Sequence, residues 1–295
     1  MKTPTAFHTA GIDWNEVWAK EIDLWHASSG KTCREFWADK RSAEIFAQKN
    51  SKDHKHRIKQ TLEGLELNGD MRVLDIGAGP GNLAVPMAKL THSVTAIEPS
   101  PGMIQVLTDR IRHENITNIR PIEQSWEAVP FDLLVPPFDL VIASLSLGMR
   151  DIGAAIDKMN QVCDGQVTLF WHGGIPEWET MPKALWPDLY GKPYHGGPKG
   201  DLLFMVLYQK GIYPMVQVFS NYFCEIFSSM DEAVDFYCKR FKSLGAEHRP
   251  VLTAYLENHC EKTARGLVHG FNHKIMKFSW MTEDIGEDFG KGEMP

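Results

Sequence analysis

The chain of 295 residues has few cysteines, no long apolar run and no long basic run. Its five cysteines are scattered and form no C-x-x-C pair, which argues against a disulfide framework or a zinc ribbon. No apolar run approaches the roughly 20 residues that a membrane-spanning helix needs, and residues 1–11 lack the apolar stretch of a signal peptide. We therefore expect a cytoplasmic protein with reduced thiols, no metal site and no membrane association.

Positive charge is also scarce, since the formal net charge is −7 at pH 7. The broad positive field on which non-specific nucleic-acid binding depends is therefore not expected. Hydrophobic residues make up 43% of the chain and charged residues 23%, which is ordinary for a globular protein. The length suits one large α/β domain, or a core domain with a cap.

The most informative segment reads as a strand, a glycine turn and a helix over residues 72–90. Residues 73–76 are a short apolar run, typical of a buried parallel strand. The glycines that follow are Gly77, Gly79 and Gly81. Glycine accepts positive φ and lets a ligand approach the main chain. A second strand, residues 93–97, ends at Glu98, and an acid in that place binds a ribose diol in βαβ nucleotide sites.

Residues 74–81, Leu-Asp-Ile-Gly-Ala-Gly-Pro-Gly, resemble motif I of class I S-adenosylmethionine (SAM) methyltransferases, and residues 98–103 are similar to that family's next motif. Asp75 precedes the first glycine by two residues, where NAD-binding loops usually carry an apolar residue. Asn82 stands where G-x-G-x-x-G has its third glycine. The resemblance covers about residues 60–175. It implies an α/β fold with a doubly wound, mainly parallel seven-stranded sheet whose last strand is antiparallel.

The resemblance also implies how SAM, or its product S-adenosylhomocysteine (SAH), is bound. The glycine loop would reach the methionine part, Asp75 would order the loop toward the amino group, and Glu98 would bind the ribose. Met103 would pack on the adenine or in the helix core. Ser125 and Trp126 stand where the family often has an acid for the adenine. The predicted cofactor contacts are Asp75, Gly77, Ala78, Gly79, Gly81, Glu98, Pro99, Met103, Ser125, Trp126 and Ser144.

Four regions are expected along the chain. Residues 1–50 form an N-terminal helical lid, residues 51–175 the SAM-binding Rossmann core, residues 176–282 a cap with the last two strands, and residues 283–295 a loose tail. The tryptophan-rich N-terminal helices, the first capped by Asp13, either close over the crevice or pack for stability alone. The helix that starts near Ser51 carries Lys55, Arg57 and Lys59, which we interpret as a solvated basic face.

The pattern loosens after the fifth strand, residues 166–171. Residues 172–200 are rich in glycine and proline and predict loops. Residues 215–227 and 271–280 predict the last two strands of the sheet. Helices over residues 230–244 and 251–268 would form an insertion between these strands.

Candidate catalytic residues come from an aromatic-rich stretch, since residues 170–227 hold thirteen aromatic residues. This stretch could be the core of a cap or an apolar pocket for a flat substrate. His172 follows the fifth strand at the edge that faces the ligand crevice. There it could take a proton from the acceptor, orient the acceptor, or bond to a loop carbonyl. The candidates are His172, Tyr194 and His195.

The resemblance predicts in-line methyl transfer from SAM to a small acceptor that is flat or apolar. The N-P-P-[YF] signature of nucleic-acid amino methylases is absent, because residues 143–148 read Ala-Ser-Leu-Ser-Leu-Gly. The expected partner is therefore a small molecule and not a nucleic acid. The alternatives are a protein that binds SAM or SAH without turnover and, less favoured, an NAD-linked oxidoreductase. The acceptor atom, the use of a general base and the oligomeric state stay open.

Overall fold

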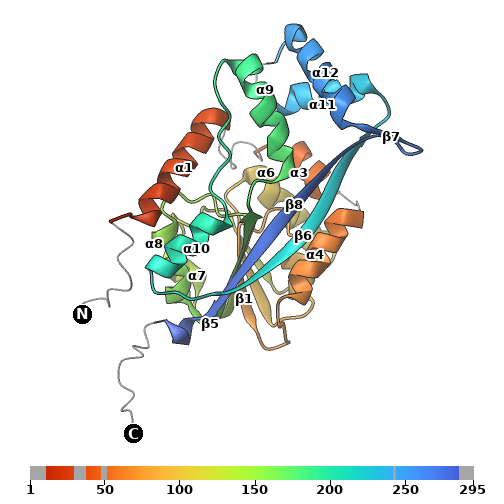
Figure 1. Cartoon of the computed structure of the whole chain (residues 1–295). Helices are drawn as coiled ribbons and strands as arrows, with labels where there is room; N and C mark the ends of the chain where they lie inside the picture. Colours follow the sequence, from red (N-terminus) through yellow and green to blue (C-terminus); the bar gives the residue numbers. More distant parts are fainter. Residues whose placement is uncertain (1–10, 30–37, 48–51, 242–243, 286–295) are drawn as a thin grey trace.

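The computed structural model describes residues 11–29, 38–47, 52–241 and 244–285, and a mixed sheet forms its centre (Figure 1). The strands are β1 (Arg72–Ile76), β2 (Ser93–Ile97), β3 (Ile119–Ile122), β4 (Phe138–Ser144), β5 (Cys163–Gly173), β6 (Met215–Phe227), β7 (Glu261–Thr263) and β8 (Gly266–Met281). Their order is β3-β2-β1-β4-β5-β8-β6, with β7 paired to β8. Strands β1 to β5 are parallel, whereas β8 is antiparallel to β5 and β6. The predicted seven-stranded sheet is confirmed, and β7 adds a short eighth strand.

Helices cover both faces of this sheet. They are α1 (Trp14–Ser29), α3 (Lys40–Ala47), α4 (Lys52–Glu63), α5 (Ala84–Ala88), α6 (Pro101–His113), α7 (Phe131–Leu134), α8 (Ile152–Val162), α9 (Thr180–Tyr190), α10 (Gly200–Gln209), α11 (Met230–Arg240) and α12 (Arg249–His259). Short 3₁₀ helices are η1 (Glu177–Glu179), η2 (Ala246–His248) and η3 (Thr282–Asp284). Helices α1, α8 and α10 pack on one face, and α4, α5 and α6 on the other. Within the described ranges, no helix is long and apolar enough to cross a membrane.

Strand alternation decides which layer each side chain enters. On β1, Leu74 and Ile76 pack toward α1, α8 and α10, while Val73 packs toward α4 and α5. Asp75 therefore points to the second face, which we call the α4 face.

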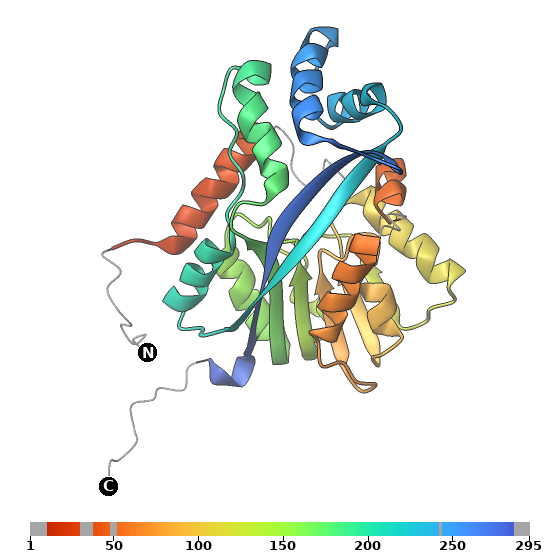
Figure 2. The same ribbon diagram turned by 45° about the vertical axis from the view of Figure 1, so that its right-hand side comes forward.

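Strands β6 and β8, with 13 and 16 residues, are the longest of the sheet and extend past the carboxyl edge of the parallel strands (Figure 2). Their outer half carries α11 and α12, which form a small separate core with α9. This core buries Met181, Leu185, Trp186, Leu189, Phe227, Ala233, Val234, Tyr237, Phe241, Leu252, Leu256 and Leu267. The predicted insertion thus forms a cap above the edge at which the cofactor motifs end.

Two predictions for this part of the chain were wrong. Residues 180–190, expected as loop, form α9, in which Pro182 lies in the first turn, where its missing N–H costs no helix bond. Pro187 lies inside the helix, which the burial of Trp186 and Leu189 stabilises. Residues 261–268, expected as helix, form β7 and the start of β8, because the chain turns at Gly266 with φ of +120°.

The N-terminal helix is anchored firmly to the sheet. The Asp13 carboxylate caps it, accepting hydrogen bonds from the N–H groups of Asn15 (2.9 Å) and Glu16 (3.1 Å). Trp18 and Ile22 are fully buried, and the Trp18 indole N–H donates to the Met149 carbonyl (2.9 Å). These contacts support a packing role for α1. The lid role of residues 1–50 stays a prediction, and residues 1–10, 30–37 and 48–50 lie outside the described residues, as does 286–295 of the expected tail.

Candidate functional site

The glycine loop follows β1 at the carboxyl edge of the sheet, and its glycines have different roles. All have positive φ, which is +74° at Gly77, +55° at Gly79 and +82° at Gly81. A Cβ atom on Gly77 would lie 2.3 Å from Cβ of Ser146, and one on Gly81 would lie 2.5 Å from a methyl of Leu107. A Cβ atom on Gly79 would meet nothing within 4 Å. Gly77 and Gly81 are therefore required by packing, whereas Gly79 leaves open space above the loop.

Glu98 holds this loop in place. Its Oε2 accepts a hydrogen bond from the Gly79 N–H (2.9 Å), and its Oε1 accepts one from the Ser100 N–H (2.8 Å). Only 6% of the residue is exposed, and burial raises the pKa of its carboxyl group, although these N–H donors oppose the shift. Each carboxylate oxygen has a second lone pair, so Glu98 can also accept hydrogen bonds from ligand hydroxyls.

Asp75 is the second acid at the loop, and it is buried with only 2% of its surface exposed. Burial, together with the nearby charge of Glu98, raises the pKa of its carboxyl group to about 7. Its Oδ2 has no hydrogen-bond partner among the described residues. A buried carboxyl oxygen without a partner, beside an open loop, suits a ligand that brings a positively charged N–H group.

Further unpaired polar atoms continue from Asp75 across the sheet. They belong to Asp75 (Oδ2), Ser144 (Oγ), His172 (Nδ1), His273 (Nδ1) and Asn221 (Nδ2), on strands β1, β4, β5, β8 and β6, and we call them the polar row. Strand alternation places all five on the α4 face, in phase with the buried Val73, Ile142, Phe170 and Ile275 and the partly buried Phe219. Since folded proteins pair nearly all buried polar groups, the polar row marks where ligand atoms would complete hydrogen bonds.

His172 stands in the middle of the polar row. Its ring lies 5.1 Å from the Trp178 ring in an edge-to-face arrangement. Burial, followed by the charges of Lys199, His273 and Arg57, lowers the pKa of its imidazole to about 3. Such an imidazole is neutral and only weakly basic at neutral pH, which favours orienting an acceptor over removing its proton.

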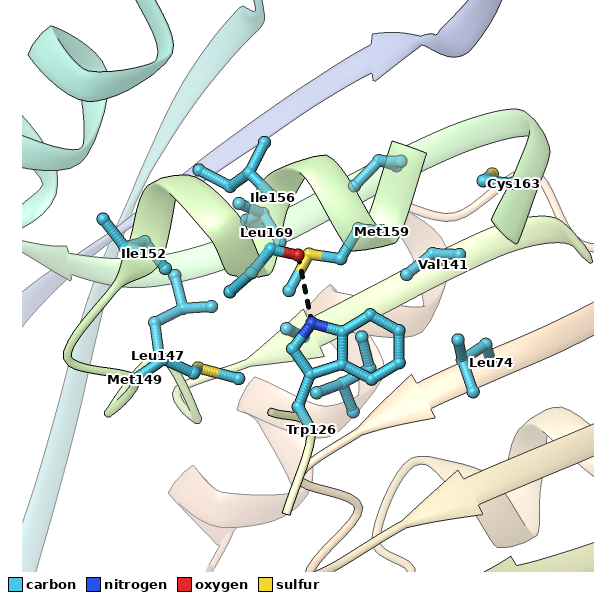
Figure 3. Packing of buried hydrophobic residues seen from close by; sticks show 14 of the residues in the cluster. Leu74, Trp126, Val141, Leu147, Met149, Ile152, Ile156, Met159, Cys163 and Leu169 are labelled. Atoms are coloured by element: carbon cyan, nitrogen blue, oxygen red, sulfur yellow. Dashed lines mark hydrogen bonds between the residues drawn. The ribbon is translucent and has the colours of Figure 1, made fainter. Parts of the chain in front are cut away.

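The side chains predicted to contact the adenine are occupied by contacts within the protein, unlike the open glycine loop. Trp126 is buried and its indole N–H donates to the Ala155 carbonyl (3.0 Å), so the side chain points into the core between β4 and α8 (Figure 3). Met103 packs with Ala43 of α3, which supports the helix-core alternative. The Ser125 hydroxyl accepts a hydrogen bond from the Ala128 N–H (3.3 Å) and caps a turn. These side chains contact the protein itself, and their roles toward SAM stay predictions, as do those of Ala78 and Pro99.

Tyr194 and His195 contact α1 and α9. The Tyr194 ring packs edge-on against Trp186 at 5.1 Å, and burial raises the pKa of its hydroxyl. The His195 N–H donates to the Ser28 hydroxyl (3.2 Å), which in turn donates to the His195 carbonyl (3.0 Å). These contacts indicate a structural role for both residues, and their catalytic role stays a prediction.

Sequence reasoning missed several residues of this region. Asn221 and His273 join the site only because β6 and β8 fold back beside β5. Arg57 was interpreted as part of a solvated basic face, yet burial lowers the pKa of its guanidinium. No local motif marks these residues. Among the described residues, no group of three or more His, Cys, Asp or Glu is placed to hold a metal ion.

Comparison with known proteins supports the assignment of the core. Residues 73–165 match the family model described as a methyltransferase domain. The chain is 30% identical over 153 residues to an uncharacterized protein of Haemophilus influenzae, covering 52% of this chain and 55% of that one. It is 30% identical over 82 residues to the 23S rRNA (uracil(1939)-C(5))-methyltransferase RlmD of Edwardsiella ictaluri, covering 28% of this chain and 19% of that enzyme. The matched region thus spans about half of the first relative and about a fifth of the second.

Solved structures share the fold. The YcgJ protein of Bacillus subtilis is 17% identical with a TM-score of 0.53, covering 77% of this chain and 98% of that one. A protein from Bacillus halodurans is 15% identical with a TM-score of 0.54, covering 76% of this chain and 98% of that one. At this level of identity, the likeness concerns the fold alone.

Proposed function

We propose that this chain, whose residues 73–165 match a methyltransferase domain, transfers the methyl group of SAM to a small acceptor with a flat or apolar body. The observation that carries this proposal is the polar row. It begins at Asp75, beside the open space over Gly79, and runs to Asn221 and His273, and the His273 ring lies 4.9 Å from the Trp178 ring. The first end suits the cofactor, and the second end suits an acceptor.

The residues at the cofactor end fit SAM chemically. The Asp75 carboxylate can accept a hydrogen bond from the amino group, Glu98 can accept from the ribose hydroxyls, and the main chain at Gly79 leaves room for the methionine part. Bound SAM supplies a methyl group activated by its sulfonium. The protein's own contribution is then mainly to hold the two reactants in line.

Two observations favour a small molecule over RNA as the acceptor. The likeness to the rRNA methyltransferase covers only 28% of this chain, and the net charge of −7 gives no broad positive surface for RNA phosphates. The cap formed by α9, α11 and α12 instead packs on the outer parts of β6 and β8, the strands that carry the acceptor end of the polar row (Figure 1), and could enclose a small ligand beside them.

A matched pair of glycine variants tests the cofactor end. Gly79 and Gly191 both have positive φ, and a Cβ atom would meet nothing within 4 Å at either position, but Gly191 only ends α9. Asparagine tolerates this backbone conformation. By calorimetry, Gly79→Asn should weaken SAH binding by about tenfold or more, whereas Gly191→Asn should not change it. Equal SAH binding by both variants would remove the loop from the cofactor site.

The acceptor class needs a second experiment. The protein is incubated with methyl-labelled SAM and with separate small-molecule and RNA fractions of a cell extract. We expect the label in the small-molecule fraction, and less of it with Gly79→Asn at a SAM concentration below the dissociation constant of that variant. Label only in RNA would overturn the small-molecule proposal, and SAH binding without any transfer would favour the non-catalytic alternative.

A further inference from the structure

Arg57 carries an uncompensated positive charge next to the acceptor end of the polar row. Its neighbours on α4, Ile58 and Leu62, pack on the α4 face together with Phe219 of β6 and Ile275 of β8. Arg57 is half-buried, and this partial burial lowers the pKa of its guanidinium, while no hydrogen bond or ion pair joins that guanidinium to another described residue. A sheltered guanidinium without a partner is costly unless a ligand compensates its charge.

The packing of α4 brings Arg57 to the level of His273. The Lys277 ammonium group donates to the Gly64 carbonyl (2.6 Å), which fixes the end of α4 against β8. Arg57 lies about 10 Å from Gly64 along the helix at 1.5 Å per residue, and His273 lies about 13 Å from Lys277 along the strand at 3.3 Å per residue. Accordingly, burial and the charge of Arg57 together lower the pKa of His273 to about 4.

Flat aromatic surfaces lie beside this charge. The Trp178 ring lies 5.1 Å from His172, 4.9 Å from His273 and 5.4 Å from Phe223. Trp178 and Phe223 are only partly buried, so a ligand can reach them. The nearby Lys199 is already paired with Glu179 (2.8 Å). The two histidines are neutral at pH 7, so they add no second positive charge beside Arg57, and an imidazole cannot balance a guanidinium in either protonation state.

We propose that the acceptor carries an oxyanion, a carboxylate or a phosphate, which Arg57 binds, while the flat body of the acceptor packs against Trp178 and Phe223. This inference rests on the proposed methyl transfer and specifies its substrate class. Guanidinium groups bind both oxyanions through two parallel N–H donors. Asn221 and the two histidines would then bond polar atoms of the flat body and set its orientation.

Naphthalene compounds that differ in one group test the proposal. Binding of 2-naphthoate, 2-naphthyl phosphate and 2-naphthamide to the SAH-saturated protein is measured by calorimetry. At least one of the two acids should bind about tenfold or more tightly than the neutral amide. Arg57→Gln should abolish this preference without changing SAH affinity. Lys59→Gln removes the same charge from the same helix at a side chain that is 72% exposed, and it should keep the preference.

The outcomes separate the two proposals. Equal binding of acids and amide, or an unchanged preference in Arg57→Gln, would overturn the role of Arg57. Absence of binding by all three compounds to SAH-saturated protein would overturn the aromatic surface as their site, and Trp178→Ala should weaken all three if it is correct. Failure of the wild-type protein to bind SAH would instead overturn the proposed function itself.

Discussion

The Glu98 carboxylate already accepts hydrogen bonds within the protein, from the N–H of Gly79 on the glycine loop and from the N–H of Ser100. Its predicted bonds to the ribose would be additional to these. Glu98→Gln keeps a side-chain oxygen for one of these bonds but removes the charge. We expect SAM affinity to fall by roughly 1.5–3 kcal/mol, the range for hydrogen bonds to charged groups, with a similar melting temperature. Calorimetry measures the affinity, and Glu123→Gln at an exposed position is the control. Unchanged affinity would show that Glu98 does not bind the ribose.

Asp75 makes stability depend on pH in a direction unusual for an acid. Because burial and Glu98 raise the pKa of its carboxyl group from 3.8 to about 7, the folded protein holds a proton that the unfolded chain releases between these values. The free energy of unfolding should therefore decrease as pH rises from about 4 to about 7, by at most roughly 1.4 kcal/mol per pH unit from this group. Urea unfolding across this range should show a weaker decrease in Asp75→Asn. Identical pH dependence in both proteins would contradict the raised pKa.

His172 is expected to orient the acceptor as a neutral ring. His172→Ala should lower methyl transfer by roughly 10²-fold and leave SAH affinity almost unchanged. Because the pKa of His172 is lowered to about 3, its ring does not titrate near pH 6.5. The pH profile of turnover around pH 6.5 should therefore have the same shape in the wild-type protein and in the variant. The exposed His92→Ala is the control. Full turnover by a stable His172→Ala protein would remove this residue from the mechanism.

At the residue level, the sequence predicted best what is local. Asp75 precedes the glycine loop by two residues and Glu98 follows the next strand, β2, so short motifs indicate both positions, while their contacts with SAM stay predictions. Arg57 and His273 are distant in the chain and approach only through the packing of α4 on the last strands. A basic residue among lysines gives no sign of such burial.

Two helices that precede the core differ in how firmly they are held. Helix α1 buries Trp18 and Ile22 completely, whereas among the described residues the cluster under α3 buries Ala43, Met103 and Val106, with Phe46 and Ala47 partly buried. We expect amide hydrogens of α1 to be protected from exchange with or without SAH, and those of α3 to gain protection when SAH binds. Exchange measured by mass spectrometry tests both. Equal gains in both helices would support a lid that includes α1, and no gain in either would leave only packing roles.

The elements that were predicted correctly are specified by neighbouring residues, whereas those that were missed depend on contacts with segments distant in the sequence. Strand β1 was predicted to within one residue, because the short apolar run of residues 73–76 indicates a buried parallel strand. Helix α9 was missed because its prolines indicate loop, while its stability comes from packing on α11 and α12. The start of β8 was missed because it pairs with β6, which is distant in the sequence, and with β7, which is too short to give a recognisable strand pattern.

The charge of the whole molecule gives a prediction about RNA. With a net charge of −7, the protein should show no tight, salt-dependent binding to an rRNA fragment in filter-binding assays at low ionic strength. Addition of SAH should not change this result. A dissociation constant in the nanomolar range that weakens steeply with salt would contradict the prediction and favour an RNA acceptor.

Strands β6 and β8 pass from the sheet to the cap without interruption, and they pair along 13 residues of β6. His273 and Phe223 therefore stand on the same hydrogen-bonded backbone that fixes β8 beside β5. In the described residues, β6 and β8 contain no hinge between the sheet and the cap. The distance between the acceptor end of the polar row and the cofactor end is therefore fixed by the sheet. Such a protein would select acceptors by the span between their acidic group and their methylated atom.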